Sequence, residues 1–151
     1  MFRKDPRYRQ GVYKPINRKK YSGKHDPIYR SSWELKFFRW ADKNSRVVRW
    51  GSENIIIPYV SPVDRRIHRY FVDNFIVFLN SENKPKKYLI EIKPSKSVAK
   101  PVPNKRKKES TILYEQKTWL INQAKWEAAK KWAEEKDYEF LILTEKELNI
   151  N

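Results

Sequence analysis

Two acidic residues and a lysine stand among apolar residues in the middle of this sequence. Asp73 lies in the run His-Arg-Tyr-Phe-Val-Asp-Asn-Phe-Ile-Val-Phe-Leu over 68–79, and Glu91 and Lys93 lie in Tyr-Leu-Ile-Glu-Ile-Lys over 88–93. Neighbouring carboxylates repel each other, which raises a pKa unless a cation lies between them. Proteins bind magnesium through one or two carboxylates, and water and phosphate supply its other ligands. The three residues therefore indicate a metal site for phosphodiester chemistry.

A β-hairpin is the element that would bring these residues together. Both runs are rich in β-branched and aromatic residues, and the polar segment 80–85 between them has the composition of a turn. Side chains alternate between the two faces of a strand, so Asp73 shares a face with Phe75, and Glu91 shares a face with Lys93. We expect one long strand that continues through Asp73, and a register that places Asp73 beside Glu91.

The net charge predicts a polyanionic partner. The chain has 151 residues, a length typical of one domain, and a formal net charge of +16. Residues 1–30 carry ten Lys and Arg against two acids, and residues 94–109 carry six against one, whereas residues 110–151 carry six against eight. Nucleic acid is therefore the first expectation for a partner, and an anionic membrane surface is the second.

Residue types that are absent or rare exclude several other classes of protein. The sequence has no cysteine, which excludes disulfides, zinc-thiolate sites and thiol catalysis. Its three glycines are too few for a glycine-rich phosphate-binding loop. It has no signal peptide and no apolar run of about 18 residues, so we expect a soluble protein without a membrane partner.

A helix with an acid near its start is predicted over 31–42. Ser31 and Glu34 have the spacing of a capping box, in which the Glu side chain reaches back to the N–H of the N-cap residue. Glu34 also lies beside the apolar stripe that contains Phe37 and Ala41, where a carboxylate would point inward as a site ligand. The two roles are compatible, and both remain open.

The order of the expected elements is helix, strands, helix, strand. This order predicts an α/β (α+β) fold in which helices flank a mixed central sheet. On the second helix, Asn122 and Lys125 lie at the margin of the apolar stripe, where they either face solvent or reach toward the metal site. The remaining expected elements are short strands over 46–50 and 54–59 around a Gly51-Ser52 turn, a turn over 61–66, a helix over 118–136 and a strand over 139–143.

Two basic segments accompany the expected single domain over 31–151. Residues 1–30 read as an irregular arm with interspersed tyrosines, which is a disordered tail, an arm along a phosphate backbone or a docking segment for a protein. The proline-containing segment 94–110 is either a loop that grips nucleic acid or a solvated loop. The candidate DNA contacts are Arg30, Arg65, Arg66, His68, Arg69, Lys96, Lys100, Lys105, Arg106, Lys107 and Lys108.

A helix with Glu34, a strand with Asp73, Glu91-Ile-Lys93 on the next strand and a following helix resemble the PD-(D/E)xK nuclease core over residues 31–143. Val72 stands where the family name has proline, at a position that tolerates apolar residues. The resemblance implies that Asp73 and Glu91 bind Mg²⁺ or Mn²⁺ and that Lys93 orients water or stabilises the phosphate. It also implies catalytic roles for Asp73, Glu91, Lys93 and Glu34. The metal site that we expect from the residues adds the Ile92 carbonyl and a water-mediated Glu34 as further ligands, and Asn122 and Lys125 as accessory residues.

Several runs make a closer resemblance, which covers nearly the whole chain. Residues 29–34, 57–64, 68–73, 122–126 and 143–148 resemble the head completion nucleases of T-even-like tailed phages, and the longer transposon-end-cutting subunits of some transposases are also similar. The resemblance implies a magnesium-dependent DNA endonuclease that acts on double-stranded DNA after packaging and before tail attachment. It implies phage portal or neck proteins as partners, and the host cytoplasm or the virion head or neck as the location.

Two other functions remain as alternatives. The first is a non-catalytic DNA- or portal-binding head-closure protein, although retained acids would only repel each other in a protein that binds no metal. The second is an RNA-binding module, although no aromatic motif of the RRM type occurs, and inward-facing acids would repel phosphate in the absence of metal. Binding of nucleic acid that requires metal would separate the nuclease from the RNA-binding module. The sequence leaves the oligomeric state open.

Overall fold

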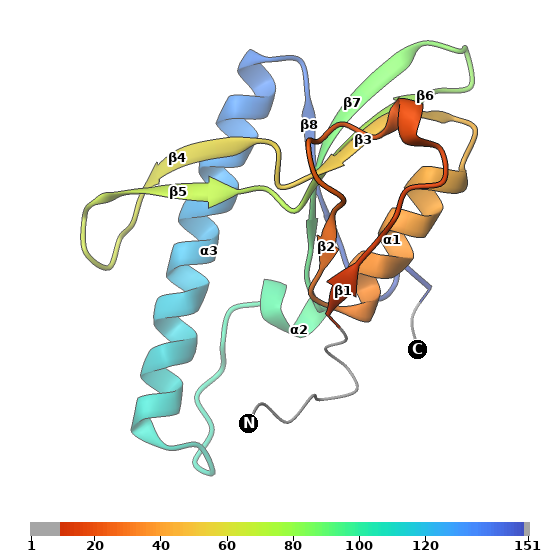
Figure 1. The fold of residues 1–151 in the computed structure, drawn as a ribbon. Coiled ribbons are helices and arrows are strands. Elements are labelled where there is room, and N and C mark those ends of the chain that lie inside the picture. Colours follow the sequence, from red (N-terminus) through yellow and green to blue (C-terminus); the bar gives the residue numbers. More distant parts are fainter. Residues whose placement is uncertain (1–9, 150–151) are drawn as a thin grey trace.

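A four-stranded mixed sheet forms the centre of the protein, as seen in a computed structural model that describes residues 10–149 (Figure 1). The strand order is β3 (Val47–Ser52), β6 (Asn74–Leu79), β7 (Pro85–Ile92) and β8 (Glu139–Leu143). The first three strands pair antiparallel, and β8 pairs parallel to β7. The structure confirms the expected mixed sheet, the hairpin turn over 80–85 and the last strand.

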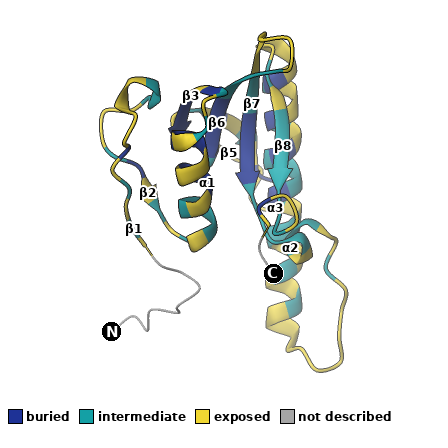
Figure 2. Ribbon diagram, turned by 90° about the vertical axis from the view of Figure 1, so that its right-hand side faces the viewer, coloured by how far each residue is buried: buried dark blue, intermediate teal, exposed yellow. Residues whose placement is uncertain are grey.

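Helices cover the two faces of this sheet. Phe75 and Leu89 point to the face covered by α3 (Glu109–Glu135), where they pack in one cluster with Trp126. The next residue along each strand points to the face covered by α1 (Ser32–Lys43), because side chains alternate. Figure 2 shows the buried residues concentrated in the strands between the helices. The α1-side cluster contains Phe37, Phe38, Ala41, Val47, Trp50, Ile76 and Ile90.

Two further strands form a separate antiparallel ribbon. Strands β4 (Ile56–Val60) and β5 (Ile67–Phe71) pair only with each other and cross over α3 (Figure 1). Ile57 and Tyr70 are direct partners in this ribbon, and both are buried in the α3-side cluster. The predicted turn over 61–66 connects the two strands. The ribbon is therefore attached to the body through its inner end, and the turn projects outward.

The expectation of one continuous strand through Asp73 is wrong. Strand β5 ends at Phe71 and β6 begins at Asn74, so the chain leaves one sheet and enters the other across two residues. The N–H of the buried Val72 donates to Ile55 O at 3.0 Å, and Asp73 O accepts from Glu53 N at 3.1 Å. Because Val72 and Asp73 form these hydrogen bonds with the segment before β4, the strand does not continue from β5 into β6 as alternation predicts.

The expected turn at Gly51 and Ser52 is also wrong. Both residues lie in β3, where Gly51 pairs with Phe75 and Ser52 pairs with Asn74. A Cβ atom on Gly51 would lie 2.3 Å from Asn54 Oδ1 and 2.5 Å from the Phe75 ring. Glycine is present here because of this close approach between neighbouring strands, and its role is not to form a turn.

The second helix starts nine residues before the predicted Thr118, at Glu109. Its first turns extend beyond the sheet, and the segment before them runs alongside (Figure 1). Leu113 and Tyr114 are exposed there, so this part of α3 has no buried stripe that a sequence pattern could reveal. The basic loop also contains a short helix, α2 (Ser95–Val98), that the sequence did not indicate.

Residues 10–30 are not an irregular arm. Strand β1 (Gly11–Val12) pairs with β2 (Ile28–Tyr29), and the 3-10 helix η1 (Arg18–Lys20) lies between them. The rings of Tyr13 and Tyr21 pack on Trp50, with centroids 6.3 and 4.9 Å away. These two tyrosines are partly buried and pack against the α1-side cluster. The expectation for residues 1–9 lies outside the described residues, and the domain boundary at residue 30 stays a prediction.

Asp42 at the end of α1 fixes this N-terminal segment. It is fully buried and accepts hydrogen bonds from Tyr13 Oη at 2.6 Å, Ile16 N at 2.8 Å and Asn17 N at 3.0 Å. Burial alone would raise the pKa of Asp42, but these hydrogen bonds, with the charge of Lys20, lower it below its usual value. The ionised form of Asp42 therefore contributes to stability.

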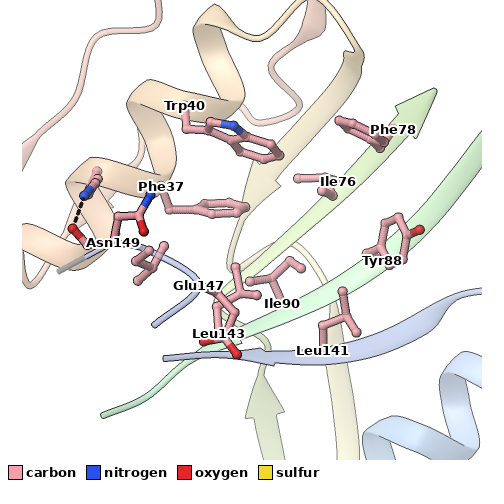
Figure 3. Close-up of a pocket in the computed structure, with 12 residues that line it drawn as sticks. Phe37, Trp40, Ile76, Phe78, Tyr88, Ile90, Leu141, Leu143, Glu147 and Asn149 are labelled. Carbon is pink, nitrogen blue, oxygen red and sulfur yellow. Dashed lines mark hydrogen bonds between the residues drawn. The ribbon is translucent and has the colours of Figure 1, made fainter. Parts of the chain in front are cut away.

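The α1 face of the sheet is incompletely covered. A groove of about 490 Å³ lies between α1 and the segment after β8 (Figure 3). Its walls are mainly apolar, and Lys36 and Glu147 lie at it. The groove is on the opposite face of the sheet from Leu89 and Glu91, since Ile90 lines it. No helix among residues 10–149 is long and apolar enough to cross a membrane.

Replacing Asp42 by Asn should destabilise the protein by about 2–3 kcal/mol, because an amide leaves buried donors without an acceptor. Hydrogen exchange should increase in residues 10–17, and urea unfolding should report the loss. The pKa of Asp42 in the folded protein lies below its unfolded value of about 3.9. Its contribution to the free energy of unfolding is therefore complete above the unfolded pKa and is lost as the pH falls through the folded pKa. Asp137→Asn, at an exposed acid, is the matched control, and equal stabilities of the two variants would contradict this role.

Candidate active site

The register of β6 and β7 places Asp73 beside Glu91. Asn74 pairs with Ile90, so the residue before Asn74 stands opposite the residue after Ile90. Asp73 Oδ2 also accepts a hydrogen bond from Ile92 N at 2.8 Å, which fixes its carboxylate against the end of β7. The juxtaposition that alternation predicted is therefore present, although Asp73 lies in the break between strands.

Both carboxylates are held in surroundings that disfavour their charge. Glu91 is only 5% exposed, and Asp73 is half-buried. Burial raises the pKa of Asp73 well above its usual value, and the charge of Glu91 raises it further. Burial likewise raises the pKa of Glu91, while a hydrogen bond from Tyr70 and the charges of Lys93 and Lys125 counteract part of this effect. The pair is electrostatically costly, and additional positive charge would relieve that cost.

Two lysines approach Glu91 from different elements. Lys93 Nζ lies 3.9 Å from Glu91 Oε1, and Lys93 N donates to Leu143 O at 3.0 Å, which ties the end of β7 to β8. Lys125 comes from α3, and its Nζ lies 5.6 Å from the centre of the Tyr70 ring. Of the two interpretations of Lys125, the structure supports the one in which it reaches toward the acids.

Glu34 reaches the same region from the start of α1. Ser31 caps the helix by accepting from Glu34 N at 3.2 Å, as predicted. The capping box predicts that the Glu34 side chain accepts a hydrogen bond from the N–H of the N-cap residue, Ser31. It accepts instead from the N–H of the preceding residue, Arg30. Burial raises the pKa of Glu34, the charges of Arg30 and Lys93 lower it, and the charge of Glu34 in turn raises the pKa of Asp73. Its carboxylate thus belongs to the electrostatic environment of the pair.

Three residues of this region were not expected from the sequence. Tyr70 donates its hydroxyl hydrogen to Glu91 Oε2, and Glu53 forms an ion pair with Arg30. Trp126 Nε1 is buried without a hydrogen-bond partner among the described residues, yet it lies close enough to Glu91 to lower its pKa. Strand alternation would place Tyr70 on the opposite face from Asp73, and only the break after Phe71 brings them to the same side.

Among residues 10–149, the other candidate residues form no hydrogen bond or ion pair with the two acids, although the charge of Asp73 helps to raise the pKa of Arg30. Asn122 is 7% exposed and lines a groove of about 680 Å³ with Lys96 and Trp119, between α3 and the basic loop. His68 is exposed, as expected, and its Nε2 is 2.7 Å from Asp64 Oδ2. The remaining candidate DNA contacts are exposed on the ribbon (Arg65, Arg66, Arg69), before α1 (Arg30) and in the basic segment (Lys100, Lys105, Arg106, Lys107, Lys108).

The donor set suits a hard divalent cation that retains water ligands. Among residues 10–149, no group of three or more acidic or histidine side chains lies close enough to hold a metal ion on its own. Asp73 and Glu91 nevertheless provide two adjacent carboxylates, and burial raises the pKa of both. Magnesium needs no more protein ligands than this when water and substrate phosphate complete its octahedron.

Comparison with known proteins places these residues in a family context. Residues 44–145 match the family model described as the TnsA-like endonuclease N-terminal domain. The chain is also 37% identical over 139 residues to the head completion nuclease of enterobacteria phage T4, an alignment that covers 89% of this chain and 90% of that protein. The matched family segment contains both acids of the pair and Lys93.

Replacing Asp73 by Asn should stabilise the metal-free protein at neutral pH by about 1–2 kcal/mol, the usual gain when one unfavourable residue of a functional site is replaced. The amide oxygen can still accept from Ile92 N, and the repulsion with Glu91 is removed. Because the folded pKa is raised, the stability associated with Asp73 is complete below the unfolded pKa and is lost as the pH rises through the folded pKa. Urea unfolding in EDTA should therefore show a gain at pH 7 that shrinks in acid, whereas a loss of stability at pH 7 would refute this explanation.

Proposed function

The chain belongs to the family of TnsA-like endonuclease N-terminal domains, and from this premise we propose that it hydrolyses phosphodiester bonds in double-stranded DNA with Mg²⁺ or Mn²⁺ as cofactor. The observation that carries this proposal is the pair of Asp73 and Glu91 with Lys93 Nζ 3.9 Å from Glu91 Oε1. Two carboxylates and an ammonium group in one partly buried site suit the binding of a divalent cation and of a phosphate.

The acids of the site would hold the metal ion. Asp73 and Glu91 would provide carboxylate oxygens, the Ile92 carbonyl would be a third protein ligand, and Glu34 would contribute through water. The hydrogen bond from Ile92 N keeps the Asp73 carboxylate oriented toward its neighbour on β7. A bound divalent ion supplies Lewis-acid stabilisation of the charge that develops on the phosphate.

The remaining charged groups stabilise the phosphate and accept the proton of the attacking water. Lys93 lies beside the attacking water or a non-bridging phosphate oxygen, where its charge stabilises the transition state. The water oxygen forms a new bond to phosphorus, and Glu34 accepts the proton of the water. The bond from phosphorus to one ester oxygen breaks, and that oxygen leaves with the bonding electrons and takes up a proton from solvent. Glu34 is a candidate for the role of base because its charge acts on Asp73 and the charge of Lys93 acts on Glu34, so its carboxylate lies near the pair. Lys125 and Asn122 are accessory residues on α3.

Basic segments on either side of the site bind the DNA backbone. The β4–β5 ribbon crosses α3 with three exposed arginines and His68, and the loop before α3 carries the other group (Figure 1). Both can contact phosphates without reading sequence. Contacts on two sides of the site are compatible with a duplex that continues past the cleaved bond, and we propose endonucleolytic cleavage on this basis and on the family description.

The biological role that we propose follows the name of the phage T4 relative. The protein would complete filled phage heads after DNA packaging and before tail attachment, with portal or neck proteins as partners. It would act in the host cytoplasm or on the virion head or neck. A non-catalytic head-closure protein that binds DNA or the portal is the second candidate, favoured only by the high net charge.

Purified protein should nick or linearise supercoiled plasmid in Mg²⁺ or Mn²⁺ and should be inactive in EDTA. Asp73→Ala should abolish cleavage because it removes a metal ligand, and Lys93→Ala should reduce the rate by about 100-fold or more. Gel electrophoresis of the plasmid forms measures both effects.

Lys84→Ala provides the matched control, since this lysine lies in the turn between β6 and β7, at the other end of both strands from the acids. Its cleavage rate should equal that of the wild type. DNA that is retarded but intact in every metal would favour the head-closure protein. Cleavage that survives Asp73→Ala would mean that the site lies elsewhere.

The salt dependence of DNA binding should identify the ribbon contacts. Binding of the Asp73→Ala variant should weaken with salt by about 0.9 log units per log unit of salt for each phosphate contacted. Replacing Arg65, Arg66 and Arg69 together by Ala should lower this slope by roughly three times that amount. Lys84→Ala with Lys86→Ala, which removes two charges at the distant end of the β6–β7 hairpin, is the comparison. An equal loss of slope per removed charge in both variants would exclude a specific role for the ribbon.

A further inference from the structure

Tyr70 occupies an unusual place between the ribbon and the sheet. It is 3% exposed, and its backbone pairs with Ile57 inside the β4–β5 ribbon. The ring packs in the α3-side cluster, while the hydroxyl reaches Glu91 on β7 of the other sheet. A buried tyrosine generally needs a partner for its hydroxyl, and here the partner is a carboxylate of the proposed metal site.

The two oxygens of Glu91 have different partners. Oε2 accepts the hydrogen bond from the Tyr70 hydroxyl, and Oε1 lies on the side of Lys93, 3.9 Å from its Nζ. A hydrogen bond to a charged acceptor has a preferred direction, so it fixes the rotation of the carboxylate as well as its position. Among residues 10–149, only Tyr70 donates a hydrogen bond to the Glu91 carboxylate, and Trp126 Nε1 lies near it without a hydrogen-bond partner. Oε1 is therefore the oxygen that remains available to a metal ion.

Aromatic and cationic contacts hold the Tyr70 ring in this position. Lys125 Nζ lies 5.6 Å from the centre of the Tyr70 ring and 5.9 Å from that of Tyr59 on the neighbouring strand. Cations at this distance from aromatic faces are attracted by the ring quadrupole. The ring is thus fixed by the ribbon on one side and by α3 on the other, and its hydroxyl has little freedom to leave Glu91.

We propose that Tyr70 is a positioning residue that restricts Glu91 to one metal-binding oxygen, Oε1, and thereby favours magnesium over calcium. Magnesium accepts single carboxylate oxygens in an octahedral shell with water, whereas calcium takes six to eight ligands and often a bidentate carboxylate. With Oε2 bonded to Tyr70, bidentate binding by Glu91 would cost the hydrogen bond. This inference rests on the proposed function, because it concerns the same metal.

The test is Tyr70→Phe, which removes the hydroxyl and keeps the ring. Binding of Mn²⁺ to the DNA-free protein, measured from the electron paramagnetic resonance signal of the free ion, should weaken by about 10-fold or more. The Mg²⁺ concentration that gives half-maximal plasmid cleavage should rise similarly. The Ca²⁺ concentration that inhibits cleavage should rise much less, so the preference for Mg²⁺ over Ca²⁺ should fall.

Tyr59→Phe is the matched control, since its ring also contacts Lys125 but the hydrogen bond to Glu91 stays in place. It should retain the metal affinity and selectivity of the wild type. Thermal unfolding in EDTA establishes that both variants fold. A purely structural role of Tyr70 would weaken the binding of all three ions equally, and that result would overturn the proposal.

Infrared difference spectroscopy on the wild type tests the same geometry even if Tyr70→Phe does not fold. The carboxylate bands of Glu91 are those that disappear in Glu91→Gln. In Mg²⁺, the frequency difference between the symmetric and antisymmetric stretches of this carboxylate should be that of monodentate binding. A difference typical of bidentate binding would contradict the proposal. Unchanged Mn²⁺ binding by a folded Tyr70→Phe would overturn it as well. A wild-type protein that neither binds Mn²⁺ nor cuts DNA would instead refute the proposed function.

Discussion

The adjacency of two partly buried carboxylates is the constraint on which the site depends. Asp73 and Glu91 stand opposite each other because β6 and β7 pair in a single register, and the hydrophobic clusters on both faces of the sheet fix that register. Burial, together with the repulsion between them, raises the pKa of Asp73, so the folded protein bears a local free-energy cost. Lys93 and Lys125 offset part of it. Such costs are typical of functional sites, where stability is given up for binding or catalysis.

The parts of the fold that could be predicted are those that depend on residues close together in the sequence. The hairpin that contains Glu91 is defined by alternating apolar residues and a polar turn, and the last strand by the compact run over 139–143. Ser31 as an N-cap follows from its position before an apolar helix. The family comparisons confirm the resemblance to head completion nucleases that the sequence indicated. The individual roles of the four site residues stay predictions.

The features that could not be predicted depend on contacts between distant segments. The strand break after Phe71 rests on hydrogen bonds with residues before β4, which a local pattern does not contain. In the sequence, the tyrosines near the N-terminus are indistinguishable from those of an exposed arm, because their partners Trp50 and Asp42 lie far along the chain. The start of α3 was missed because its exposed turns have no reason to carry an apolar stripe. Tyr70 reaches Glu91 only after the chain has changed sheets.

That change of sheets has a mechanical consequence. The ribbon and the central sheet are separate hydrogen-bonded units, and the chain joins β5 to β6 through Val72 and Asp73 alone. Tilting of the ribbon relative to the sheet must be taken up by the backbone angles of these two residues and of the segment that leads into β4. One of the two is the acid that faces Glu91. A change in the position of the inner end of the ribbon would therefore also change the backbone of a site residue.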